Sequence, residues 1–315
     1  MAPFACLTVN TLRRLFNAPL NWACGFLGGV FLGVLATPVC AATLTPAVEL
    51  RGTYHWTENI SRASGAADFR DAAEYELGGT ARYSRQLTSR LLARLDLDAA
   101  VWTSPEYEAL ERFEFGPRFT LTRKFGLGSE AWVLAADAGI TGRIGRLEEA
   151  DAAGASTGLT LSKRFSPWLA AAASGNWTGQ EARDSAFGVA HYAYEGRLIL
   201  DPHPRIRFSA GAGRRDGTFT VGASGARFSR ALAGALGPAV AEYYAAIPTV
   251  DADMFGPGWV SYRVEAEVEE WWCEVSPALT DRASLALRYG RAHFLNRVDV
   301  EYRQDTVALS FLYAF

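Results

Sequence analysis

The sequence has little cysteine and, after its first segment, no long apolar run. Four cysteines occur in 315 residues, and Cys6, Cys24 and Cys40 all lie among the first 41. Cys273 is alone in the rest of the chain, so no disulfide framework can form there. No stretch after residue 41 reaches the roughly 20 apolar residues that a membrane-spanning helix needs. These two absences exclude a disulfide-rich fold and a helical membrane protein.

The chain also lacks a surplus of positive charge. It carries 31 Lys and Arg against 34 Asp and Glu, a formal net charge of −3. Residues 1–41 contain Arg13, Arg14 and no acid, so the remainder has 29 basic against 34 acidic residues, or −5. This balance argues against a nucleic-acid partner. No zinc-ligand spacing or Gly-rich phosphate loop occurs either, so we expect no bound metal and no cofactor.

The first 41 residues have the order of segments found in an export signal. Arg13 and Arg14 supply a positive n-region, and residues 23–36 read ACGFLGGVFLGVLA as an apolar h-region. Small residues at 39–41 provide a cleavage site. We therefore expect a signal peptide over residues 1–41 that is removed on export.

A membrane anchor is the alternative interpretation of this segment. Its uncharged run is interrupted by Asn17, Pro19 and Asn21, and the strongly apolar part is too short to span a bilayer. The signal peptide is the better explanation. It leaves a mature domain over residues 42–315.

In the mature domain apolar and polar residues alternate almost throughout, which is the period of a half-buried strand. Twelve segments show the pattern: 46–56, 73–83, 90–102, 111–124, 130–143, 156–165, 168–178, 187–200, 205–215, 259–273, 282–293 and 302–315. A soluble β-sandwich would also alternate, but it has no reason to expose an apolar face on every strand. A membrane protein without spanning helices must be a closed barrel. The sequence therefore predicts an all-β fold, an antiparallel transmembrane β-barrel of about twelve strands.

The links between these segments alternate between short and long. Short periplasmic turns and long extracellular loops are the asymmetry expected of an outer-membrane barrel. With the N-terminus inside, aromatic residues fall into two bands at the membrane surfaces, with Trp102 and Tyr262 near the outer rim and Trp272 near the inner one.

One link, residues 218–257, is far longer than an ordinary loop. Its middle is rich in Ala and carries Phe228, Leu232, Leu236 and Val240 at spacings near four. It could form a short helix pair that folds into or across the mouth and narrows it. It could equally be an extracellular loop with its own small apolar cluster.

The last nine residues point to a particular class of barrel. Val307, Leu309, Phe311, Tyr313 and the terminal Phe315 project from one face of a strand that ends the chain. This resembles the C-terminal signature of the Gram-negative outer-membrane β-barrel superfamily, which includes the porins. The resemblance implies an outer-membrane location, contact with outer-membrane lipid and lipopolysaccharide, and an assembly signal of Phe311, Tyr313 and Phe315 that the barrel-assembly machinery reads. It indicates neither a subfamily nor an oligomeric state.

Charged residues, nearly all of the positive ones Arg, alternate with the apolar face and are expected to line the lumen. The predicted pore-lining residues are Arg51, Arg82, Arg94, Asp96, Arg118, Asp137, Arg207, Arg263, Glu265, Glu267, Glu269 and Arg288. Among them Glu265, Glu267 and Glu269 would form an acidic stripe. The lumen could be a polar channel, or a narrow interior filled with paired charges that conducts little.

An enzymatic function has weaker support. Residues 154–158 match G-x-S-x-G, but a strand follows them where that motif needs a helix. His55 and His293 could approach each other near the outer rim, with Ser61 or Asp299. The sequence favours a passive, porin-like channel for small hydrophilic solutes, with a lipid-modifying hydrolase and a structural or secretion-associated barrel as alternatives.

Overall fold

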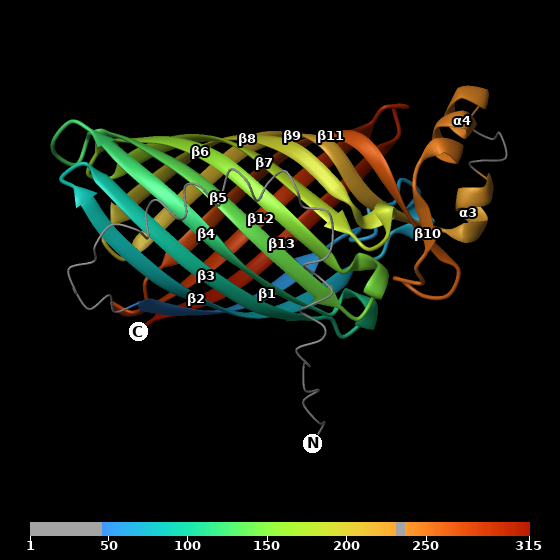
Figure 1. Ribbon diagram of the computed structural model, residues 1–315, viewed down its shortest axis with the longest axis horizontal. Helices are drawn as coiled ribbons and strands as arrows, with labels where there is room; N and C mark the ends of the chain where they lie inside the picture. The colour runs from blue at the N-terminus through green and yellow to red at the C-terminus, as the bar shows by residue number, and fades with distance from the viewer. Residues whose placement is uncertain (1–45, 231–236) are drawn as a thin grey trace, which may run out of the picture. The chain divides into compact units, whose positions relative to one another are not determined.

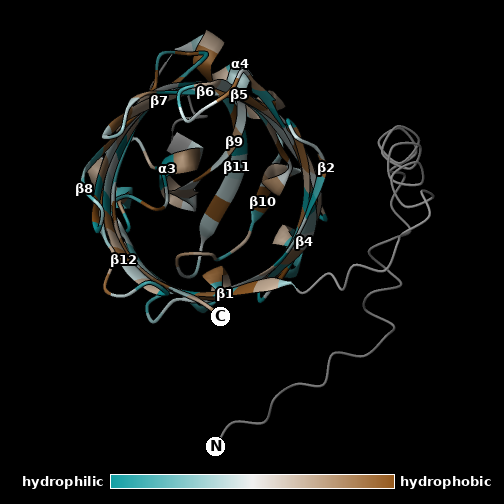
Figure 2. Cartoon of the chain, turned by 90° about the vertical axis from the view of Figure 1, so that its left-hand side faces the viewer, coloured by the Kyte–Doolittle hydropathy of each residue, from teal (hydrophilic) through white to brown (hydrophobic). Residues whose placement is uncertain are grey.

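The computed structural model describes residues 46–230 and 237–315. Within them the strands form one antiparallel sheet, and this sheet closes because β9 pairs with β11 as well as with β8. Figure 1 shows the barrel from the side, and Figure 2 looks along it at the closed ring of strands. The predicted signal peptide, residues 1–41, lies outside the described residues.

The predicted barrel of twelve strands is confirmed. The wall consists of β1 (Ala47–Thr57), β2 (Ala72–Thr88), β3 (Leu91–Thr103), β4 (Arg112–Phe125), β5 (Trp132–Gly145), β6 (Ala152–Ser166), β7 (Leu169–Ala182), β8 (Val189–His203), β9 (Ile206–Ser224), β11 (Trp259–Pro277), β12 (Ala283–Asn296) and β13 (Glu301–Ala314). The largest difference from the sequence prediction is β9, which runs nine residues past its expected end at residue 215. A further short strand, β10 (Thr249–Asp251), pairs with the first residues of β11.

The helical elements of the described residues belong to the long connections. They are the 3-10 turns η1 (Ala66–Asp68), η2 (Glu108–Leu110), η3 (Glu148–Ala150) and η4 (Ser185–Phe187), and the helices α3 (Gly225–Arg230) and α4 (Pro238–Ala246). In residues 46–230 and 237–315 no helix is both long and apolar enough to cross a membrane. Figure 1 places α3, α4 and β10 at one end of the barrel and the C-terminus at the other. By the usual asymmetry of such barrels, the end with α3 and α4 is extracellular.

The outer face of the wall is apolar and exposed. Leu77 of β2 is 69% exposed, and the residues that pair with it, Gly52 of β1 and Val101 of β3, share its face. Leu159 of β6 and Leu198 of β8 are 57% and 56% exposed on the same side of the sheet. An apolar outer surface of this kind is stable against lipid and not against water.

Candidate functional site

The register of the sheet assigns each predicted pore-lining residue to a face. Leu77 points outward, and residues that pair with each other on neighbouring strands share a face. Side chains alternate along each strand, so the residues next to an outward residue point into the lumen. Eight of the predicted residues face the lumen: Arg51, Arg82, Arg94, Asp96, Arg118, Asp137, Arg207 and Arg288.

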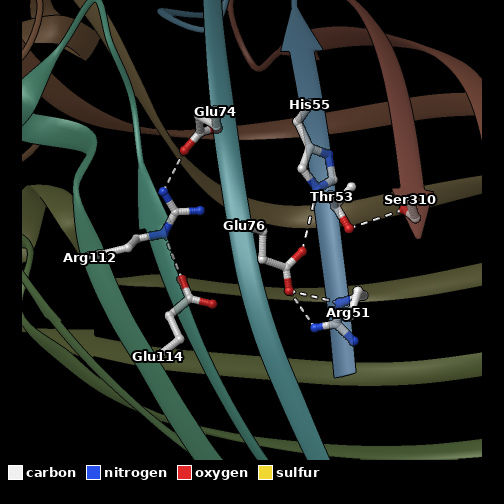
Figure 3. Close-up of polar contacts among 8 residues, drawn as sticks. All are labelled: Arg51, Thr53, His55, Glu74, Glu76, Arg112, Glu114 and Ser310. Carbon is white, nitrogen blue, oxygen red and sulfur yellow. Dashed lines mark hydrogen bonds and ion pairs between the residues drawn. The ribbon is translucent and has the colours of Figure 1, made fainter. Parts of the chain in front are cut away.

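Glu76 is the centre of a polar group on the inner wall of β1 and β2 (Figure 3). Arg51 Nε donates to Glu76 Oε1 over 2.9 Å, and His55 Nε2 lies 3.5 Å from Glu76 Oε2. Nearby, Thr53 Oγ1 donates to Ser310 Oγ of β13 over 3.1 Å. The Glu76 side chain is only 6% exposed, so this carboxylate depends on its paired neighbours for stability.

Arg112 of β4 joins two acids of the same wall (Figure 3). Its Nη1 lies 2.6 Å from Glu74 Oε1 and its Nε 2.8 Å from Glu114 Oε1. Its guanidinium also stacks over Trp102, 4.3 Å from the ring centroid. Trp102 therefore faces the lumen, and the sequence prediction that placed it on the lipid side at the outer rim is wrong.

Two more groups of charges lie closer to the periplasmic end. Asp96 Oδ1 accepts from Arg82 Nε over 2.9 Å, and Asp96 Oδ2 lies 2.9 Å from Arg94 Nε in an ion pair. Asp201 lies 3.0 Å from Arg164 Nη2 and 2.8 Å from Arg207 Nε. In each group one carboxylate holds two arginines, an arrangement that suits the guanidinium geometry.

Trp272 also faces the lumen and not the inner lipid rim, so that prediction is wrong as well. The guanidinium of Arg288 lies 4.0 Å from the centroid of the Trp272 ring, and Trp272 Nε1 donates to Glu195 Oε2 over 3.1 Å. A Cβ on Gly211 would lie 2.6 Å from the indole. A glycine at 211 thus leaves room for the ring against the inner wall.

The remaining four predicted pore-lining residues lie on the opposite face. They are all on β11: Arg263, Glu265, Glu267 and Glu269. Glu267 pairs in register with Leu295, which is outward and 37% exposed, and Trp271 on the same face of β11 is 46% exposed. Glu265 and Glu267 form ion pairs with Arg297 and Arg214. The predicted acidic stripe is therefore on the outer surface of the barrel.

The face of β11 was assigned wrongly because its apolar residues pack inside the mouth. They belong to one buried cluster, which we call the mouth cluster: Phe219, Val221, Ala223, Tyr244, Tyr262, Val264, Ala266, Val268, Ala292, Phe294 and Tyr302. Val268 and Val264 are 0% and 1% exposed. Near this end the lumen side of β11 is a packed core and its outer side carries charges, the reverse of the membrane-spanning pattern.

Helix α4 covers the mouth cluster. Tyr244 of α4 is 5% exposed, its hydroxyl lies 3.1 Å from that of Tyr302, and Asn296 Nδ2 donates to it over 3.2 Å. The ring of Phe228 in α3 lies 5.0 Å from that of Tyr262. Tyr262 is thus a lumen-side residue and not part of the outer aromatic band. In the described part of residues 218–257, α3 and α4 form, with Pro238 opening α4, and their side chains pack on the inner wall.

A second segment, the loop of residues 58–71 between β1 and β2, also enters the mouth. The carbonyl of Ser61 accepts from Gly222 N over 2.8 Å, and Arg62 Nη1 donates to the carbonyl of Thr220 over 3.1 Å. Thr220 and Gly222 are on β9, which is separated from β1 by β11, β12 and β13. The loop therefore crosses the extracellular mouth of the barrel. Nothing in its sequence beyond length indicates this path.

The suggested catalytic grouping does not form. His55 faces the lumen beside Glu76, whereas His293 faces outward, 3.4 Å from Glu301. The G-x-S-x-G string lies inside β6, with no helix after it. In the part of the chain that the structure describes, no group of three His, Cys, Asp or Glu residues could hold a metal ion.

A closed barrel of twelve antiparallel strands, apolar outside and charged inside, has the outer-membrane β-barrel fold. Comparison with solved structures supports this class. The COG4313 outer membrane channel from Pseudomonas putida F1 matches with a TM-score of 0.53 and 14% identity over 87% of this chain and 97% of that one. The CymD monoaromatic hydrocarbon channel matches at 0.44 and 10% identity over 90% and 92%, and the KdgM porin at 0.40 and 8% over 84% and 99%. At 14% identity the likeness to the COG4313 channel concerns the fold alone.

No protein-family model matches the chain, and no curated protein matches it.

Proposed function

We propose that the protein is a passive, porin-like channel of the outer membrane for small hydrophilic solutes. The observation that carries the proposal is that the lumen ion pairs join side chains of nearby strands and not of opposite walls. Arg51 and Glu76 are on neighbouring strands, as are Arg82 and Asp96, and Arg112 reaches Glu74 only two strands away. Charges paired along the wall line a passage, whereas pairs across the bore would fill it.

Single-channel recording in planar bilayers tests the proposal. The refolded barrel should give stepwise ionic conductance that is absent from a heat-denatured sample at the same detergent concentration. A folded sample that produces no steps over a wide range of voltage and salt would contradict the channel function. A lipid-hydrolysis assay on that sample would then test the hydrolase alternative.

The route to the membrane is a further part of this proposal. A cleaved signal peptide over residues 1–41 would deliver the chain to the periplasm, and the C-terminal strand would be read by the barrel-assembly machinery. Outer-membrane lipid and lipopolysaccharide would surround the folded barrel. The structure is compatible with this role for Phe315, whose ring is 67% exposed and lies 4.9 Å from that of Tyr313, where a partner can reach it.

Replacing Phe315 with Ala should lower the amount of folded barrel in the outer membrane without changing the fold of the molecules that assemble. The backbone of Phe315 donates to the carbonyl of Val48 over 2.9 Å, and Ala retains that bond. The change therefore removes the aromatic anchor and not the strand pairing. Heat-modifiable protein in outer-membrane fractions measures the effect, with Leu279→Ala in a periplasmic turn as the control. An unchanged folded fraction would contradict the assembly signal.

A further inference from the structure

Three arginines from different parts of the chain lie in the lumen near its extracellular mouth. We call them the arginine cluster: Arg62 of the β1–β2 loop, Arg143 of β5 and Arg215 of β9. Burial, followed by the positive charges of Arg215 and Arg143, lowers the pKa of Arg62 to about 10, against a smaller opposite effect of Glu74. Arg62 stays charged at neutral pH. The like charges of Arg215 and Arg143 therefore act on the guanidinium of Arg62.

The backbone holds Arg62 in place. Arg62 and Asn59 both have left-handed backbone angles, with φ of 53° and 54°, which non-glycine residues adopt at a cost. The buried Asn59 side chain compensates: Nδ2 donates to the carbonyls of Ala63 and Arg303 at 2.9 and 2.8 Å, and Oδ1 accepts from Ser61 Oγ at 3.0 Å. Such a network holds a strained loop in one conformation and keeps the Arg62 side chain in the lumen.

Several polar atoms of this region have no hydrogen-bond partner among the described residues. These are the buried Nε atoms of Arg62 and Arg215 and the buried Nδ1 atom of His191. His191 stacks on Phe219 at 5.4 Å, and the guanidinium of Arg215 lies 5.8 Å from the same ring. The guanidinium of Arg62 lies 5.5 Å from the centroid of the Phe294 ring, and this ring packs against Phe219 with centroids 5.6 Å apart. The unpartnered nitrogens therefore belong to side chains that lie around one pair of aromatic rings. Leaving a buried donor unpaired is costly.

The acids near the cluster are already engaged. Glu270 lies 2.8 Å from Arg215 Nη2, and Glu74 and Glu114 both bind Arg112. Among the ion pairs of the described residues, none includes Arg62 or Arg143. The region thus keeps two positive side chains without a carboxylate partner.

We propose that the arginine cluster binds the oxyanion group of an anionic solute, a carboxylate or a phosphate, and makes the lumen selective for anions. The selectivity rests on the proposed channel function, but the binding does not. Guanidinium groups pair with both oxyanions through planar, charge-assisted hydrogen bonds. Rings of Arg are a recognised means of selecting anions in a pore. An anion here would relieve the repulsion and satisfy the unpaired donors.

Calorimetry on the folded full-length barrel in detergent at low salt tests the binding directly, with citrate and inorganic phosphate as separate probes. At least one probe should bind, and Arg143→Gln should weaken that binding by roughly tenfold or more, the usual value of a charge-assisted hydrogen bond. Arg62→Gln should do the same, while Arg62→Lys, which keeps the charge, should lose less. Binding of citrate alone would assign carboxylates, and binding of phosphate alone would assign phosphates. If neither probe binds, or if both variants bind as the wild type does, the site is wrong.

Reversal potentials in a KCl gradient test the selectivity. The wild type should prefer chloride, and Arg62→Gln with Arg143→Gln should reduce that preference, most clearly at low salt where charges are screened least. The control changes Glu265, Glu267 and Glu269 to Gln together and should leave selectivity unchanged, because these side chains are outside. A wild type that conducts with no anion preference would overturn the selectivity while the channel function stands. Anion binding by a barrel that does not conduct would sustain the site and contradict the channel.

Discussion

Replacing Leu159 with Arg should lower the free energy of unfolding by about 2–4 kcal/mol, the cost of a lipid-facing Arg near the bilayer midplane. Leu159 lies midway along β6, is 57% exposed, and has the small residues Ala136 and Gly175 as its register partners. Neither partner position carries an acidic side chain, so nothing there could neutralise the new charge. Urea titration in lipid vesicles, followed by Trp fluorescence and by heat modifiability, measures the change.

The same substitution one residue further on provides a matched control. Thr160 faces the lumen between Ala135 and Ser174, so an Arg there has both space and water. Thr160→Arg should therefore cost much less than Leu159→Arg. Equal costs at the two positions would show that the assignment of inner and outer faces on β6 is wrong.

Removing the helical segment at the mouth should raise single-channel conductance. Ser224 and Trp259 are register partners at the ends of β9 and β11, so a short Gly/Ser turn can join them in place of residues 225–258. Loop closure costs little, and the twelve wall strands keep their pairing, while the short pairing of β10 with β11 is lost. The change removes Tyr244 from the mouth cluster and Phe228, which packs against it, and with them the side chains that pack on the inner wall. We expect a folded barrel that is less stable but more conductive.

A Gly/Ser replacement of residues 126–131, the β4–β5 turn at the other end of the barrel, is the control and should leave conductance unchanged. Tyr244→Phe tests the contact more gently, because it removes only the hydroxyl that lies 3.1 Å from Tyr302. It should increase the frequency of open events without changing their size. If the shortened barrel folds and conducts as the wild type does, the segment does not narrow the pore.

The mouth cluster and the loop of residues 58–71 explain why the extracellular end differs from the rest of the barrel. There the strands rise beyond the lipid belt, and water replaces hydrocarbon as the outer solvent. A charged outer face, with Arg291 and Asp305 paired at 2.6 Å, then costs little. Apolar side chains are more stable on the inside, where α4 and the loop cover them.

Sequence alone determined the strands and the barrel. Side chains along β1, β2 and β3 alternate with a period of two, and these strands have lipid on the outside and water on the inside. The face of each residue therefore follows from its position in the strand. This is why Arg51, Arg82, Arg94 and Asp96 could be placed in the lumen. The strand count came from the alternating segments, and the alternation of short and long links between them agreed with it.

Tertiary structure alone decided the face of β11 and the path of the β1–β2 loop. Alternation specifies which residues share a face and not whether that face meets lipid, water or a packed core. The inside of β11 is a packed core near the mouth, so Val264 faces inward and Glu265 outward, the reverse of the prediction. Arg62 feels the charges of Arg143 and Arg215 only because Asn59 and the edge of β9 hold its loop across the mouth. Arg62 is 81 positions from Arg143 and 153 from Arg215 in the sequence, and proximity across such separations leaves no periodic signal.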